Sequence, residues 1–191
     1  MKKLWKLGLL SIMLVGAFTA CKSPQEKLES FVNQTWNPAK DSIFAAYKLA
    51  GSTVNFTDRT VKEMAEATIY YRYFDSTTVA DFKAVSNKQK GELQLQSIMF
   101  ESIKTMVQVV EQQDLAFDKA LTANKNQTPD FEALQLQGKL LADSCLALKK
   151  KYTLAFKQSN TAAYNNNKYF NEQLELEIAL FNNKNAAPQG K

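Results

Sequence analysis

The chemistry open to this chain is limited first by the complete absence of histidine. Histidine is the usual general base, the commonest metal ligand and the group that activates serine or cysteine nucleophiles. Ser-His-Asp and Cys-His sites are therefore excluded, as are di-iron bundles built on Glu-x-x-His motifs. The sequence also has no Ser-x-x-Lys motif, no glycine-rich phosphate loop and no EF-hand calcium loop. We therefore expect a protein that is not an enzyme and that uses neither a cofactor nor a metal; an enzyme that works through carboxylate pairs or lysines is the weaker alternative.

The two cysteines, Cys21 and Cys145, are the residues with the most distinctive remaining chemistry. Cys21 follows a lysine-rich start, the apolar run 7–18 and two small residues, which is the layout of a secretory signal peptide. As a helix this run would rise only about 18 Å, against roughly 30 Å of hydrocarbon, so it is too short to span a membrane comfortably. Ordinary secretion with cleavage after Ala17, or an uncleaved anchor, are the alternatives.

The residues Phe18-Thr19-Ala20-Cys21 resemble the lipobox of bacterial lipoproteins, with Phe18 where that family usually has leucine. The resemblance implies that residues 1–20 are removed by cleavage between Ala20 and Cys21. It also implies that Cys21 carries three acyl chains, such as palmitate, and two or more chains hold a protein stably on a membrane.

The same resemblance bears on the second cysteine and on location. Acylated Cys21 would leave Cys145 as the only free thiol, so no intramolecular disulfide could form. In the family, a residue other than aspartate after the cysteine is typical of the outer membrane, and here that residue is Lys22. The expected location is therefore the cell envelope, in the outer membrane facing the periplasm.

The charge and length of the chain after the leader limit its possible partners and its number of domains. Removing Lys2, Lys3 and Lys6 with the leader lowers the formal net charge from +5 to +2. A nearly neutral chain lacks the basic face that nucleic acid requires, so no nucleic acid partner is expected. The remaining length suits one domain, predicted over 21–182, followed by a disordered polar tail at 183–191.

Three further features have a functional interpretation and a plainer one. Cys145 stands between Leu141 and Leu148 on an apolar stripe, which favours a small core residue over a redox or metal-binding thiol. An acidic trio shares one helix side and suits a hard cation, although a solvated face is favoured; its members are Glu111, Asp114 and Asp118. The lysines at 149–151 fan out around a helix, so a solvated surface is favoured over a lipid-binding patch.

The run Ile-Tyr-Tyr-Arg-Tyr-Phe at 69–74 is the strongest candidate for a partner surface. On a helix these side chains surround the axis, and exposed tyrosines are typical of binding surfaces. Tyr70, Tyr71 and Tyr73 are therefore the candidate contact residues. Packing between helices is the alternative, and the sequence favours it.

Scarce glycine and repeated apolar spacing indicate the elements that must position these residues. Tight turns draw on glycine and proline, and only four glycines follow the leader, so few and long elements are expected. Apolar residues recur at steps of three, four and seven along most of the chain, as on one face of a helix. The predicted helices cover 24–35, 38–50, about 58–74, 78–123, 129–158 and 161–182.

The sequence thus predicts an all-α fold: an elongated antiparallel bundle of about four long helices with one or two short N-terminal ones. We expect a lipid-anchored envelope protein that acts through contacts with another envelope protein, in a structural or accessory role. The alternative is a binding module that holds an apolar small molecule or a client chain in a groove of the bundle.

Overall fold

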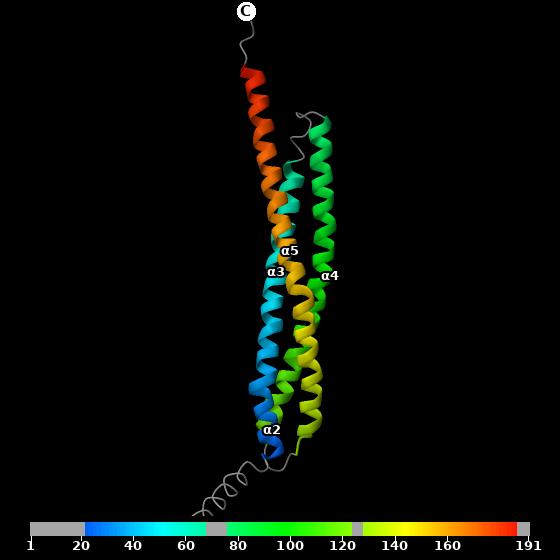
Figure 1. Cartoon of the computed structure of the whole chain (residues 1–191), viewed down its shortest axis with the longest axis vertical. Helices are drawn as coiled ribbons and strands as arrows, with labels where there is room; N and C mark the ends of the chain where they lie inside the picture. Colours follow the sequence, from blue (N-terminus) through cyan, green and yellow to red (C-terminus); the bar gives the residue numbers. More distant parts are fainter. Residues whose placement is uncertain (1–21, 68–75, 124–127, 187–191) are drawn as a thin grey trace, which may run out of the picture.

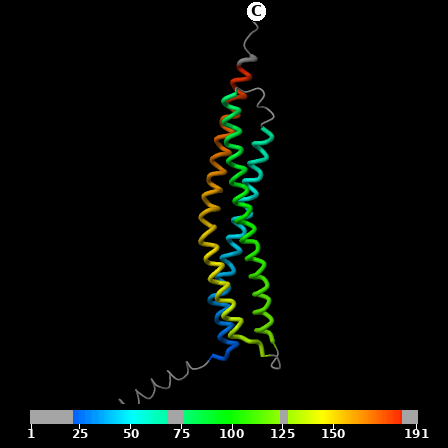
Figure 2. Tube along the Cα trace, turned by 90° about the vertical axis from the view of Figure 1, so that its right-hand side faces the viewer, coloured from blue at the N-terminus to red at the C-terminus, as the bar shows by residue number. Residues whose placement is uncertain are grey.

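The computed structural model describes residues 22–67, 76–123 and 128–186. These residues are helical almost throughout and contain no strand; the elements are α2 (Pro24–Phe31), the π-helical turn η1 (Val32–Trp36), α3 (Asn37–Ala67), α4 (Ser76–Leu121) and α5 (Phe131–Ala186). α3 runs along the molecule in one direction, α4 returns, and α5 runs parallel to α3 (Figure 1). A second view shows the same narrow rod (Figure 2). The predicted elongated antiparallel helical bundle is confirmed.

The described part of the bundle has three long helices, whereas the sequence predicted about four. The break expected between residues 50 and 58 lies inside α3, and the break expected near residue 160 lies inside α5. At 1.5 Å per residue, the continuous segment 24–67 is about 66 Å long and α5 about 84 Å. α5 also extends to Ala186, past the helix end predicted at 182, and residues 187–191 lie outside the described part.

Pro38 was expected to begin a helix, but the chain stays helical through it by means of a wider turn. A proline inside a helix has no N–H to donate, and its ring crowds the carbonyl four residues earlier. Just before Pro38, the N–H of Asn37 donates to the carbonyl of Val32, five residues back, which widens this turn. α2, η1 and α3 therefore follow one another as one rod.

The buried positions follow a seven-residue repeat that the sequence pattern showed only in part. In α3 and the turn before it, buried residues recur at alternating steps of three and four; they are Trp36, Ala39, Ile43, Ala46, Ala50, Thr53, Thr57, Thr60, Met64 and Ala67. One seam of α4 repeats every seven residues through Phe82, Gln89, Gln96, Ile103, Val110 and Phe117. A strict seven-residue repeat is the signature of left-handed supercoiling, so the rod packs as a three-helix coiled coil.

Buried threonines explain why the break predicted after residue 50 does not occur. Thr53, Thr57 and Thr60 occupy core positions and are fully buried. Each hydroxyl donates to the backbone carbonyl four residues earlier in the same helix, at 2.9 Å. Each hydroxyl proton therefore has an acceptor within α3, and the helix continues without apolar residues there.

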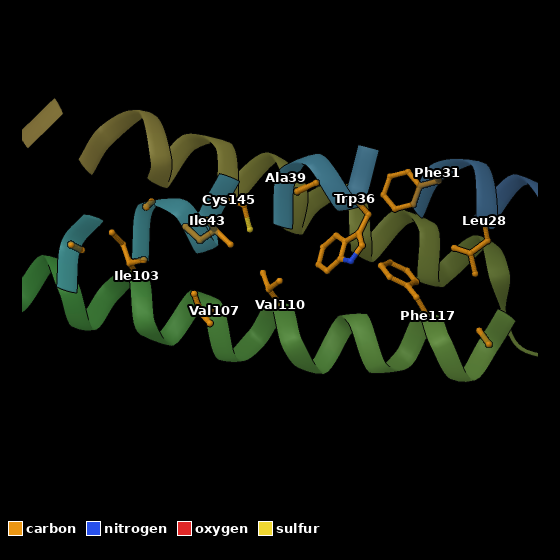
Figure 3. Packing of buried hydrophobic residues seen from close by; sticks show 14 of the residues in the cluster. Leu28, Phe31, Trp36, Ala39, Ile43, Ile103, Val107, Val110, Phe117 and Cys145 are labelled. Carbon is orange, nitrogen blue, oxygen red and sulfur yellow. The ribbon is translucent and has the colours of Figure 1, made fainter. Parts of the chain in front are cut away.

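The core consists of two apolar clusters separated by this polar section. The larger cluster surrounds Trp36 near the N-terminal end of the rod, where Trp36 and Phe31 lie close to Phe117 of α4 (Figure 3). The smaller cluster, at the far end, contains Met64, Ala67, Phe82 and Phe170. Between them lie the three threonines of α3 and, from α4, Ser86, Gln89 and Gln96. Apolar burial, the main stabilising contribution, is therefore concentrated at the N-terminal end.

Candidate functional site

At its N-terminal end, the described chain enters the bundle directly after the predicted anchor. Cys21 and Ala20 lie outside the described residues, which begin at Lys22. Ser23 caps α2: its hydroxyl accepts from the Glu26 N–H at 3.2 Å, and its own N–H donates to the Glu26 carboxylate at 2.7 Å. That backbone hydrogen bond is the main reason the pKa of Glu26 is lowered. One residue, Lys22, therefore separates Cys21 from a capped helix.

The candidate contact residues belong to the segment between α3 and α4. Tyr70, Tyr71 and Tyr73 lie outside the described residues, so their packing stays a prediction. The helix ends that flank them are described: α3 ends at Ala67 and α4 begins at Ser76, both at the end far from α2 (Figure 1).

Cys145 is a core residue, as the sequence indicated. Its side chain is fully buried in the larger apolar cluster and points toward Ile43 and Val110 (Figure 3). Burial raises the pKa of the Cys145 thiol from 9.0 to about 11. A neutral, inaccessible thiol is a poor nucleophile and a poor metal ligand.

The prediction of a solvated acidic face is wrong for Asp114. Its carboxylate is half-buried, accepts from the Trp36 indole N–H at 2.8 Å and pairs with the Lys40 ammonium at 2.8 Å. Desolvation alone would raise the pKa of Asp114, but the hydrogen bonds from Lys40 and Trp36 outweigh it, and the pKa is lowered. Asp114 accepts the hydrogen bond of the indole N–H of Trp36, whose side chain is otherwise fully buried, and this role is structural.

The other charged candidates lie on the surface. Glu111 and Asp118 are exposed, and so are the lysines at 149–151, of which Lys149 donates to Ser42 at 3.1 Å. Within the described residues, no three side chains of the histidine, cysteine, aspartate or glutamate type come together as a metal site. The acidic trio therefore does not form a common binding site, because Asp114 is engaged by Trp36 and Lys40.

A groove between α3 and α5 is a candidate site that the sequence reasoning missed. Two adjoining cavities of about 360 and 460 Å³ lie along it, and both are lined by Phe56 of α3 and Tyr164 of α5. Tyr164 is 60% exposed, and its hydroxyl has no hydrogen bond to another described residue. The sequence carries one sign of this groove, the asparagine-rich segment 160–171, but polar residues of this kind are also common on surfaces without a function.

Amide and charged side chains surround the two rings. Asn160 lines one cavity, while Asn167 and Asn171 line the other, where Asn171 donates to Asn167 at 3.0 Å. The charged residues of the groove are Arg59, Lys168, Glu172 and Glu175, so cations and anions balance. Phe56 and Tyr164 are the only apolar side chains among the residues that line the two cavities, and the others are polar or charged.

Comparison with known protein families, with curated proteins and with solved structures found no match to this chain. A search of the described helices for a long apolar stretch found none able to span a bilayer.

Proposed function

We propose that this protein is a lipid-anchored component of the cell envelope that acts through protein contacts at the end of a rigid rod. The main support for this proposal is the position of the two ends of the helical rod. The described chain begins at Lys22 at one end, and α3 ends at Ala67 toward the other, about 66 Å away along the helix axis, where α4 begins. In this proposal the rod stands on the outer membrane and holds residues 68–75 away from the bilayer, inside the periplasm.

Packing along the rod supports a spacer role. The seven-residue repeat keeps three helices in contact over most of their length, so bending the rod requires disrupting packed layers. The N-terminal end, which would stand nearest the membrane, contains the larger apolar cluster and the Trp36–Asp114 hydrogen bond. A well-packed end near the membrane and a second end far from it suit a protein that positions a contact surface for a partner.

In-cell photocrosslinking tests this proposal. A photoreactive phenylalanine analogue would replace Tyr71 in the full-length chain, and a matched variant would carry it at Leu140, which is 64% exposed near the anchor end. We expect one defined protein adduct from position 71 and no such adduct from position 140. Loss of the adduct on changing Tyr70 and Tyr73 to serine would assign the contact to the aromatic run. Equal adducts from both positions, or none from position 71, would contradict a contact at the far end.

A further inference from the structure

The α3–α5 groove has a composition that points to a particular class of ligand. Its two aromatic rings, Phe56 and Tyr164, line both cavities, so a ligand lying along the groove would meet a ring in each. One side of the Phe56 ring is covered by the Arg59 guanidinium, 5.3 Å from the ring centroid. Tyr164 is the more open of the two, with 60% of its side chain exposed. An exposed ring at a groove is a platform for a flat apolar surface.

The hydrogen-bonding groups of the groove suit hydroxyls and amides rather than ions. Asn160, Asn167 and Asn171 bring amides to the groove, and an amide both donates and accepts, as a sugar hydroxyl does. Asn171 donates to Asn167, and Asn167 donates to Glu63 at 3.5 Å, so the Asn160 amide and the side-chain oxygen of Asn171 are the groups open to a ligand. Arg59 and Lys168 are balanced by Glu172 and Glu175. The ion pairs that they make are long and exposed, Arg59–Glu63 at 3.5 Å and Lys168–Glu172 at 3.8 Å, so they are weak. A charge-balanced, amide-rich surface favours a neutral polar ligand over phosphate or a cation.

The shape of the groove indicates an extended ligand. The lining residues of α5 run from Asn160 to Glu175, which corresponds to about 22 Å along the helix. The two cavities adjoin at Phe56 and Tyr164 rather than forming one enclosed pocket. An open trough of this length suits a chain of several units better than one compact molecule.

We propose that this groove binds a neutral glycan chain, with the Tyr164 ring stacked on the apolar C–H face of a sugar and the asparagine amides paired with its hydroxyl or acetamido groups. A pyranose ring combines an apolar face with a rim of hydroxyls, which matches a ring platform bordered by amides. An extended peptide is the other occupant to distinguish; the residues that line the groove offer two rings but no aliphatic side chain to receive its apolar residues. The proposal depends on the groove alone and is independent of the lipid anchor.

The test uses the full-length chain, labelled with ¹⁵N, in micelles of a detergent without a sugar headgroup. The probes are a β-1,4-linked N-acetylglucosamine tetramer, a maltose-series glucose tetramer and a neutral hexapeptide. We expect one or both glycans to shift the backbone amide signals of residues 160–171, with little effect of the peptide. A response to the first probe alone would assign the ligand to acetamido sugars, and a response to both would assign it to neutral glycans generally.

Matched tyrosine variants then locate the binding. Tyr164→Ala should weaken glycan binding about tenfold or more, because it removes the stacking ring. Tyr164→Phe keeps the ring and should retain most of the affinity. Tyr169→Ala is the control, since Tyr169 is 46% exposed on the same helix and does not line either cavity. Absence of shifts with both glycans, stronger binding of the peptide, or equal losses in the two alanine variants would overturn the proposal.

Discussion

Two glycine-to-alanine substitutions in long helices should change stability in opposite directions. Gly91 in α4 has open space where a side chain would begin, with no atom within 4 Å. Gly138 in α5 is buried against two phenyl rings, and an added methyl group would overlap the ring of Phe117 and lie 2.9 Å from Phe31 Cε1. Both glycines lie within helices, so alanine gains the same helix propensity at each, about 1 kcal/mol. The difference between the two sites therefore comes from packing.

The Phe117 ring has little room to move away from a methyl group at Gly138. It is 1% exposed and packs edge-on against Trp36 at 5.1 Å and against Phe31 at 6.1 Å between ring centroids. Overpacking a tight core costs typically about 1–3 kcal/mol, and this contact lies at the upper end. After the propensity gain, Gly138→Ala should destabilise by about 2 kcal/mol, whereas Gly91→Ala should stabilise by about 1 kcal/mol.

Urea denaturation followed by far-ultraviolet circular dichroism measures both variants on the chain that begins at Lys22. The two midpoints should lie on opposite sides of the unsubstituted protein, with a difference of about 3 kcal/mol in the free energy of unfolding. Equal stabilisation by the two substitutions would refute the packing of α5 against Phe31 and Phe117, and with it the register of the larger apolar cluster.

The remaining predictions concern polar groups inside the bundle. Gln96→Leu should stabilise by about 1–3 kcal/mol in the same urea assay, because both polar atoms of its buried amide lack a partner among the described residues. Gln89→Leu is the control and should stabilise less than Gln96→Leu: the Gln89 side-chain nitrogen also lacks a partner among the described residues, but its oxygen accepts from Asn166 at 3.0 Å, and that hydrogen bond would be lost. Asp114→Ala should destabilise by about 1–3 kcal/mol by leaving the Trp36 indole unpaired, and Asp114→Asn, which keeps an acceptor, should destabilise less. Because the folded-state pKa of Asp114 is lowered, the stability that its charge contributes is present above its ordinary pKa of 3.8. This contribution to stability is lost as the pH falls through the lower pKa that Asp114 has in the folded protein. Asp114→Asn should therefore make the free energy of unfolding depend less on pH in this acidic range. The Cys145 thiol, with its pKa raised to about 11, should react with a thiol reagent at pH 8 only after urea is added.

The fold class could be predicted because glycine is scarce and apolar residues recur at helical spacing. The number of helices could not, for two physical reasons. Thr53 and Thr57 lie in the stretch between two predicted helices, but each of them, like Thr60, satisfies its hydroxyl within α3 and packs in the core. Pro38 looks like a helix start, but the chain stays helical through it, with a wider turn just before it in which the Asn37 N–H donates to the Val32 carbonyl.

The candidate sites also include some that could be predicted from the sequence and some that could not. The core position of Cys145 followed from its spacing to neighbouring leucines on one helix. The role of Asp114 did not, because its partners Trp36 and Lys40 belong to another helix far away in the sequence. The α3–α5 groove was missed for the same reason: Phe56 and Tyr164 acquire a shared function only when two helices are placed side by side.

The measurement that tests the account most directly is fractionation of cells that carry the full-length protein or its Cys21→Ser variant. The account predicts that the unchanged protein is in the outer-membrane fraction and incorporates a palmitate analogue. It predicts that the variant, which lacks the acylated thiol, incorporates none and leaves that fraction. A Cys145→Ser variant controls for loss of a thiol, and it should behave like the unchanged protein. Retention of the Cys21→Ser variant in the membrane, to the same extent as the unchanged protein, would contradict the lipid anchor on which the proposed orientation of the rod depends.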